Sequence, residues 1–127
     1  MIPMNKIFRR LIVFCMLLQL LIAFPVKAFA DAEEAIFAGG CFWCLEHDLE
    51  ILDGVVSAES GYSGGEMTNP TYENHSDHQE VVKVVFDPDV ISYKDLLKQY
   101  WINIDPFDDE GQFCDRGNSY KPVIFTS

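Results

Sequence analysis

The feature that most constrains this chain is the segment 39–44, Gly-Gly-Cys-Phe-Trp-Cys, which stands between an apolar run and a helical pattern. The two glycines allow a tight backbone turn and leave the first sulfur reachable. Cysteine reacts as the thiolate, which the unpaired N–H groups and positive dipole end of a helix N-terminus favour. Phe42 and Trp43 would wall the sulfur with apolar surface. The segment predicts a reactive Cys41 at a strand-to-helix turn; the alternative is a buried cysteine pair beside core aromatics.

Residues 1–30 have the pattern of a secretory signal peptide. A basic start, an apolar run over 11–24 and the small-x-small sequence Ala-Phe-Ala at 28–30 follow one another in that order. The run is short for a bilayer span, which needs about 20 apolar residues. We therefore expect a cleaved signal peptide, with an uncleaved N-terminal anchor as the alternative. The protein would then be exported, periplasmic or secreted, and its mature part would be one domain over 31–127.

Charge limits the partners of this mature part. Four of the nine basic residues and none of the twenty acidic ones lie within 1–30, so the remainder has a formal charge of −15. Such a surface argues against nucleic acid and anionic membranes as partners. The chain stops directly after an apolar strand pattern at 123–125, so we expect the domain to be incomplete at its C-terminus.

Hydrophobic periodicity divides the mature part into strands and helices. Ser92 is a suitable helix N-cap, and helical spacing assigns Tyr100 and Trp101 to the core. The order, strand-helix-strand, strand-helix, strand, predicts an α+β fold, a two-layer ferredoxin-like (split βαβ) sandwich. Strands are expected at 35–38, 55–62, 80–86 and 123–125, helices at 41–52 and 93–103, and loops at 66–77 and 105–119.

A series of short motifs follows in order along the mature part: Phe-Ala-Gly-Gly-Cys-Phe-Trp-Cys at 37–44, Ser-Gly-Tyr-Ser-Gly-Gly at 60–65, Asn-Pro-Thr-Tyr at 69–72, Glu-Val-Val at 80–82, Asp-Pro at 87–88, Ile-Ser-Tyr at 91–93, Asn-Ile-Asp-Pro at 103–106 and Gly-Gln-Phe-Cys-Asp-Arg-Gly at 111–117. By these motifs the chain, from Ala35 to Phe125, resembles the methionine sulfoxide reductase A family, the peptide-methionine (S)-S-oxide reductases. It departs from the family pattern at Asp77, where members often have glycine, and at the C-terminus, beyond which members generally continue for tens of residues.

The resemblance implies reduction of methionine (S)-sulfoxide, either free or in oxidised proteins, which the reaction would repair. We expect the protein to be a monomer. The resemblance also implies that there is no metal and no bound cofactor, and that the electrons come from an external thioredoxin-like dithiol. The site residues that it implies are Cys41, Glu80, Tyr72, Tyr120 and Asp115 for catalysis, and Phe42 and Trp43 around the methyl group of the substrate.

Reducing a sulfoxide requires a nucleophile for sulfur and an acid for oxygen. Cys41 would attack, and Glu80 would deliver the proton if an apolar setting raises its pKa. Cys41 would then become a sulfenic acid, which a second thiol converts to a disulfide. Cys44 is the first candidate for that resolving thiol, and Cys114 is the second.

Several of these residues also have ordinary structural interpretations. Without the resemblance, Glu80 would be expected to be an exposed acid at a strand start, and Asp115 could form a surface ion pair with Arg116. Three other functions also remain open: a thioredoxin-like dithiol oxidoreductase, an inactive truncated remnant, and a zinc-binding module. The zinc-binding module would use Cys41, Cys44 and Cys114 with His47, His75 or His78.

Overall fold

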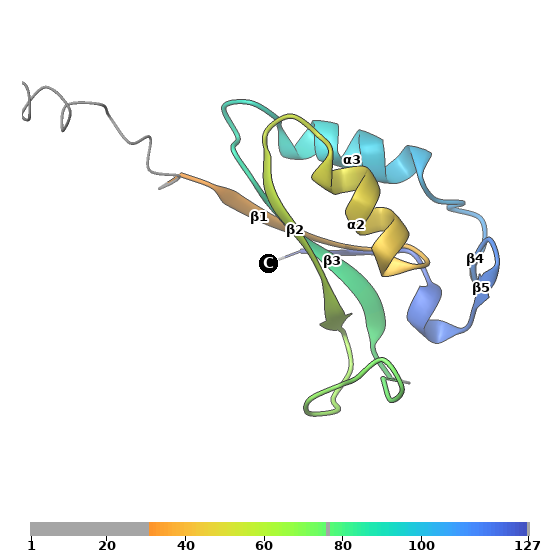
Figure 1. The fold of residues 1–127 in the computed structure, drawn as a ribbon. Coiled ribbons are helices and arrows are strands. Elements are labelled where there is room, and N and C mark those ends of the chain that lie inside the picture. Colours follow the sequence, from red (N-terminus) through yellow and green to blue (C-terminus); the bar gives the residue numbers. More distant parts are fainter. Residues whose placement is uncertain (1–30, 76, 127) are drawn as a thin grey trace, which may run out of the picture.

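The computed structural model describes residues 31–75 and 77–126 (Figure 1). The signal peptide expected over 1–30 lies outside the described residues. No helix among those described is long and apolar enough to cross a membrane. The elements in chain order are β1 (Glu33–Ala38), α2 (Phe42–Glu50), β2 (Val55–Ser63), β3 (Gln79–Phe86), α3 (Tyr93–Ile102), β4 (Gly111–Gln112), β5 (Asp115–Arg116), the 3-10 helix η1 (Asn118–Tyr120) and β6 (Val123–Phe125).

Four strands form one antiparallel sheet in the order β2-β3-β1-β6. The two halves β1-α2-β2 and β3-α3-β6 each leave a gap that a strand of the other half fills, which is the split βαβ arrangement. The helices α2 and α3 lie side by side and form the second layer (Figure 1). The predicted α+β ferredoxin-like sandwich is confirmed.

The helices form where the sequence predicts them, because each has an apolar stripe that the sheet covers. In α3, the Ser92 side chain accepts a hydrogen bond from the Asp95 backbone N–H at 3.2 Å, so Ser92 is the N-cap. Leu96 and Tyr100 are buried. The assignment of Trp101 to the core is wrong, since its side chain is 48% exposed. One residue beyond Tyr100 the helix has turned by about 100°, which points Trp101 away from the sheet.

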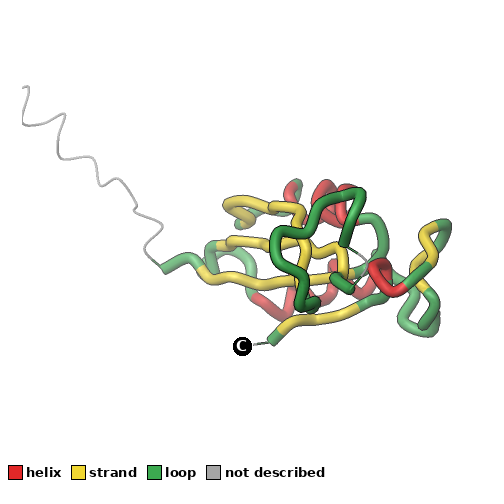
Figure 2. Tube along the Cα trace, turned by 90° about the horizontal axis from the view of Figure 1, so that it is seen from below, coloured by secondary structure: helices red, strands yellow, loops and turns green. Residues whose placement is uncertain are grey.

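The predicted loop 105–119 is more structured than expected. It contains the hairpin β4–β5 and the turn η1, which lie at the periphery of the molecule beyond the main sheet (Figure 2). Gln112, in β4, is fully buried. Its side-chain amide accepts a hydrogen bond from Asp105 N at 2.7 Å and donates one to Asp105 O at 2.8 Å. The sequence did not predict this structure, because two-residue strands show no detectable periodicity and a buried polar residue such as Gln112 adds nothing to a hydrophobic pattern.

Candidate active site

The turn from β1 into α2 depends on two closely packed glycines. A Cβ atom at Gly39 would lie 2.7 Å from Cγ2 of Ile104. Gly40 has a φ of 81°, and a Cβ atom there would lie 2.9 Å from Cβ of Gln112. Any larger residue would clash at the first position and would be strained at the second. The turn thereby fixes Cys41 directly before the first residue of α2.

Cys41 is the N-cap residue of α2, as the sequence predicted. Its sulfur is half-buried, and Cys44, one turn further along the helix, is exposed. The pKa of the Cys44 thiol is raised, first by its hydrogen bond with Cys41, then by burial and neighbouring negative charges. That hydrogen bond favours the protonated form of Cys44 and leaves the Cys41 sulfur as the acceptor. The pair therefore presents Cys44 as a protonated thiol beside the Cys41 sulfur.

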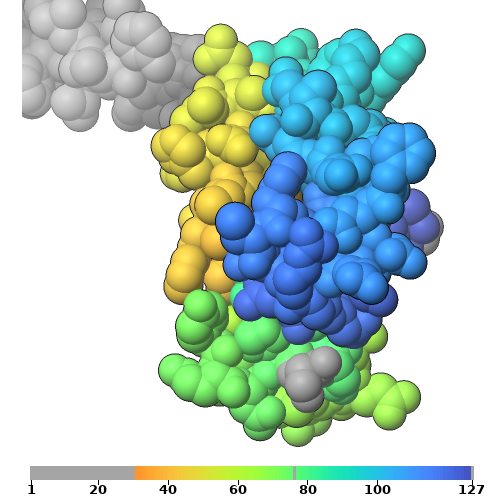
Figure 3. Space-filling view, turned by 90° about the vertical axis from the view of Figure 1, so that its right-hand side faces the viewer, coloured from red at the N-terminus to blue at the C-terminus, as the bar shows by residue number. Residues whose placement is uncertain are grey.

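A hollow of about 170 Å³ opens beside the two sulfurs. Cys114 reaches it from the β4–β5 hairpin, where the preceding Phe113 has a left-handed φ of 53°. On the face shown in Figure 3, the segment around η1 and this hairpin lies against the start of α2. Both candidate resolving thiols thus line the same hollow as Cys41. The hollow is lined by Gly39, Cys41, Cys44, Leu45, Asp48, Asn103, Phe113, Cys114 and Asp115.

Glu80 is buried, which excludes its interpretation as an exposed strand-start acid. It lies on the same face of β3 as Val82, Val84 and Phe86, because side chains of a strand alternate, and this face packs into the core. Only 2% of Glu80 is exposed. Its Oε2 accepts a hydrogen bond of 3.2 Å from the backbone N–H of Phe42, and its Oε1 is buried with no hydrogen-bond partner.

The pKa of Glu80 is raised by its environment. Burial is the largest cause and disfavours the charged carboxylate; the nearby charge of Asp115 raises the pKa further. The hydrogen bond from Phe42 N–H and the proximity of His75 act in the opposite direction and do not cancel the burial. The carboxyl therefore holds its proton to higher pH than an exposed glutamate does. A carboxyl with a raised pKa and one unpartnered oxygen is suited to deliver a proton.

Aromatic rings form the wall above the carboxyl. The Trp43 and Tyr72 rings stack with centroids 5.2 Å apart, and the Phe42 and Tyr62 rings lie 5.5 Å apart. Phe42 is buried, whereas Trp43 is 57% and Tyr72 53% exposed. The aromatic wall is thus buried at Phe42, beside Glu80, and open to solvent at Trp43 and Tyr72, which form its rim. The structure brings the predicted Phe42, Trp43 and Tyr72 together in one cluster of rings, and Phe42 links this cluster to Glu80 through its backbone N–H.

Tyr120 and Asp115 complete the set. The backbone N–H of Gly40 donates to the Tyr120 carbonyl at 3.1 Å, which ties η1 to the start of α2. The pKa of Tyr120 is raised, first by burial and then by the nearby charges of Glu80 and Asp115. The Asp115–Arg116 ion pair does not form; Arg116 pairs with Asp108 instead. Asp115 is left beside the site.

Comparison with known proteins agrees with this geometry. Residues 33–127 match the family model of peptide methionine sulfoxide reductase. The chain belongs to this family. It is 50% identical over 107 residues to peptide methionine sulfoxide reductase MsrA 2 of Caulobacter vibrioides, which covers 81% of this chain and 55% of the relative. It is 54% identical over 97 residues to MsrA of Limosilactobacillus reuteri, covering 73% and 55%.

The fold is shared with solved members of the family. Methionine sulfoxide reductase A of Corynebacterium diphtheriae superposes with a TM-score of 0.72 at 30% sequence identity, over 77% of this chain and 48% of that one. The reduced form of Mxr1 from Saccharomyces cerevisiae superposes with a TM-score of 0.66 at 27% identity, over 76% and 60%. The chain spans about half the length of the curated relatives it matches.

Asp77, where the chain departs from the family pattern, stabilises the loop between β2 and β3. Its Oδ2 accepts hydrogen bonds from the backbone N–H groups of Glu66 at 2.9 Å and Met67 at 3.0 Å, and its Oδ1 lies 3.0 Å from Nδ1 of His78. These bonds lower the pKa of Asp77. The carboxylate closes the base of the loop that carries Tyr72 over the site. Sequence reasoning noted the departure and missed this role.

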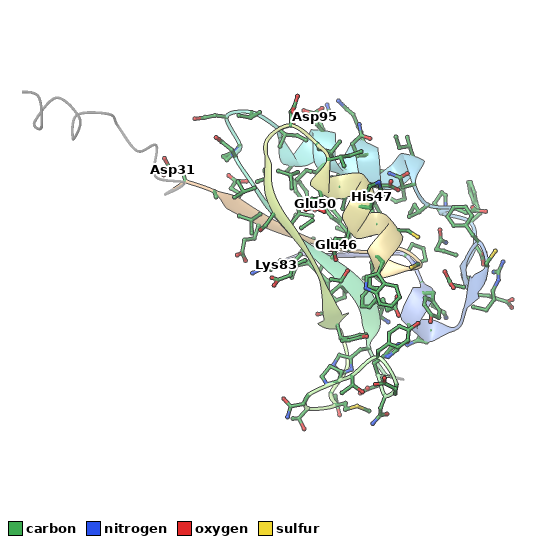
Figure 4. All side chains as sticks on the ribbon, viewed as in Figure 1. Asp31, Glu46, His47, Glu50, Lys83 and Asp95 are labelled. Atoms are coloured by element: carbon green, nitrogen blue, oxygen red, sulfur yellow. The ribbon has the colours of Figure 1, made fainter. Side chains whose placement is uncertain are left out.

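Sequence reasoning also missed a contact that aligns α2 with the sheet. Glu46, labelled in Figure 4, accepts hydrogen bonds from the backbone N–H of Ser60 at 2.8 Å and from the Ser60 hydroxyl. The bond joins α2, which follows Cys41 and carries Cys44, to β2, the strand that carries Tyr62. Glu46 lies five residues after Cys41, and no spacing in the sequence indicates a strand partner.

A metal site finds no support in this part of the chain. Among residues 31–75 and 77–126, no group of three or more histidine, cysteine, aspartate and glutamate side chains is arranged to hold an ion. The cysteines of α2 and the β4–β5 hairpin share a hollow, and the described histidines do not line it.

Proposed function

We propose that this protein reduces methionine (S)-sulfoxide, free or within oxidised proteins, to methionine. The observation that carries the proposal is Oε1 of Glu80, a buried acid oxygen without a partner, on a carboxyl whose other oxygen is bound to the helix start next to Cys41. An acid and a sulfur nucleophile so placed, under an aromatic wall, match the two needs of sulfoxide reduction.

In the reductive step, the Cys41 thiolate attacks the sulfoxide sulfur while Glu80 gives its proton to the sulfoxide oxygen. The sulfur–oxygen bond breaks, and the hydroxyl passes to the Cys41 sulfur. Methionine leaves with its sulfur reduced, and Cys41 is oxidised to the sulfenic acid. Tyr72 and Tyr120 would hydrogen-bond the oxygen, Asp115 would support them, and Phe42 and Trp43 would receive the methyl group.

Recycling then requires a second thiol. Cys44 is the first choice because its thiol already contacts Cys41; its attack on the sulfenic acid forms a disulfide and releases water. Cys114, on the same hollow, is the second choice. An external thioredoxin-like dithiol would reduce the disulfide, so no bound cofactor is needed.

We also propose that the protein is exported as a monomer and acts in the periplasm or outside the cell. The pattern of residues 1–30 supports export. Its electron donor would then be a thioredoxin-like protein of that compartment, where thiols tend to be oxidised.

The test is turnover of the separated R and S forms of an N-acylated methionine sulfoxide with dithiothreitol as reductant. We expect reduction of the S form alone, and its loss in Cys41→Ser. His47→Gln, an exposed change on the same helix, is the matched control and should retain the rate. Wild-type turnover in Cys41→Ser would refute the proposal. Reduction of insulin disulfides without sulfoxide turnover would instead indicate a dithiol oxidoreductase.

A further inference from the structure

His75 has a defined orientation beside the acid. Its ring stacks on Tyr62, with centroids 4.7 Å apart, and its Nδ1 lies 3.0 Å from the carbonyl oxygen of Thr71. A carbonyl only accepts hydrogen bonds, so Nδ1 must carry a hydrogen. In the neutral ring the lone pair is therefore on Nε2.

Nε2 is the ring nitrogen that lies near the unpartnered oxygen of Glu80. The distance from His75 Nε2 to Glu80 Oε1 is 3.8 Å, an ion-pair distance that a shift of about 1 Å converts to a hydrogen bond. The two side chains are 13% and 2% exposed, so water competes weakly. We propose that Glu80 and His75 hold one proton between them, and that this pair, instead of the carboxyl alone, is the acid of the reductive step.

Other ionisable groups face the pair without replacing His75. The pKa values of Tyr62 and Tyr120 are raised by burial and by the charge of Glu80, so both hydroxyls stay neutral near pH 7. Among the described residues, His75 is the histidine that lies within ion-pair distance of Glu80. Besides His75, the groups that interact electrostatically with Glu80 are Tyr62 from β2, Asp115 from β5 and Tyr120 from η1. These two tyrosines interact in turn with Cys41, Tyr72 and Glu73.

A shared proton changes the pH range of the acid. Two coupled sites lose their last proton with an apparent pKa above that of either site alone, because the proton has two places to reside. When the sulfoxide oxygen takes the proton, a carboxylate and a neutral imidazole remain, and the partly exposed ring takes up the next proton from solvent. His75 is thus a positioning residue that acts through Glu80 and extends its activity to higher pH.

One test is the pH dependence of methionine formation in a single turnover, which rests on the proposed function. His75→Phe keeps a ring over Tyr62 and removes both nitrogens; His75→Gln keeps a polar group that does not titrate. In both, we expect the fall in rate at high pH to begin about one pH unit lower than in wild type, with convergence below pH 6. His47→Phe, an exposed histidine on α2, is the control and should follow wild type.

The second test needs no turnover. In NMR titrations of the reduced protein without substrate, Nδ1 of His75 should keep its hydrogen, and the Glu80 carboxyl carbon and His75 Nε2 should titrate with a common midpoint. Independent midpoints would overturn the shared proton even if the enzyme reduces sulfoxide. Three outcomes of the first test would also overturn the shared proton. The pH–rate profile of the His75 variants could be unchanged, could fall equally at every pH, or could shift to higher pH, as a purely electrostatic role of His75 predicts.

Discussion

The two reactive sides of the site differ in their contact with solvent. The sulfur side is open: Cys44 and Cys114 are exposed and Cys41 is half-buried at the start of α2. The acid side is closed, with Glu80 buried in the core face of β3. The sulfur proposed to meet substrate, second thiol and reductant is reachable. The carboxyl proposed to donate a proton is dry, and burial makes it hold that proton to higher pH than an exposed glutamate does.

Each environment follows from the element that carries the residue. A helix N-cap is at a surface turn, so its side chain stays reachable while the helix amides stabilise negative charge. A central strand of an antiparallel sheet places every second side chain in the core. The hydrogen bond from Phe42 N–H to Glu80 joins the two sides, so it couples the positions of the proposed nucleophile and the proposed acid.

Removing Cys44 should separate attack from recycling. In Cys44→Ser, we expect one methionine per enzyme at nearly the wild-type rate, followed by a fall in steady-state turnover of about 100-fold, because the sulfenic acid on Cys41 has lost its nearest thiol. Mass spectrometry of acid-quenched samples would measure both product and sulfenic acid.

Non-reducing peptide maps of wild type locate the disulfide. With Cys44 as the resolving thiol, the bond lies within one tryptic peptide, since no lysine or arginine occurs between Asp31 and Lys83. A bond joining this peptide to that of Cys114 would show that the hairpin thiol resolves instead.

Removing the hydroxyl of the more buried Tyr120 should slow the reductive step more than removing that of the more exposed Tyr72. Tyr120→Phe removes a partly buried hydroxyl beside Glu80 and should slow the reductive step about 10-fold, whereas Tyr72→Phe, at the exposed rim, should slow it about 3-fold. Single-turnover rates at saturating sulfoxide provide the measurement. The reverse order would place the oxygen of the substrate at the rim.

Burial of the acid should also affect stability. Because the pKa of Glu80 is raised in the folded protein, the folded state gains from its proton at low pH and loses that gain as pH rises through the folded pKa. Glu80→Gln has no charge to bury, so its Tm should exceed that of wild type by about 4 °C at pH 8, with the difference shrinking toward pH 4. Thermal melts at each pH provide the values; a constant difference would mean that Glu80 titrates as an exposed acid.

The sequence predicted the open side better than the closed side. Cys41 at a helix start follows from glycines, apolar periodicity and a helical stripe, all of them local signals. The burial of Glu80 depends on which strand faces the helices, and the role of His75 depends on a loop closed by Asp77, so both are products of tertiary structure. Trp101 shows the same limit, because helical spacing alone did not place it correctly.

The most direct measurement is the single-turnover rate of Glu80→Gln from pH 6 to 9. Glutamine keeps the shape of the side chain and cannot donate a carboxyl proton. We predict a reductive step slowed by about 10²–10³-fold, without the fall at high pH that wild type shows, and unchanged binding of the sulfoxide. A wild-type rate and pH profile in Glu80→Gln would contradict the account, because the proton would then have to come from elsewhere.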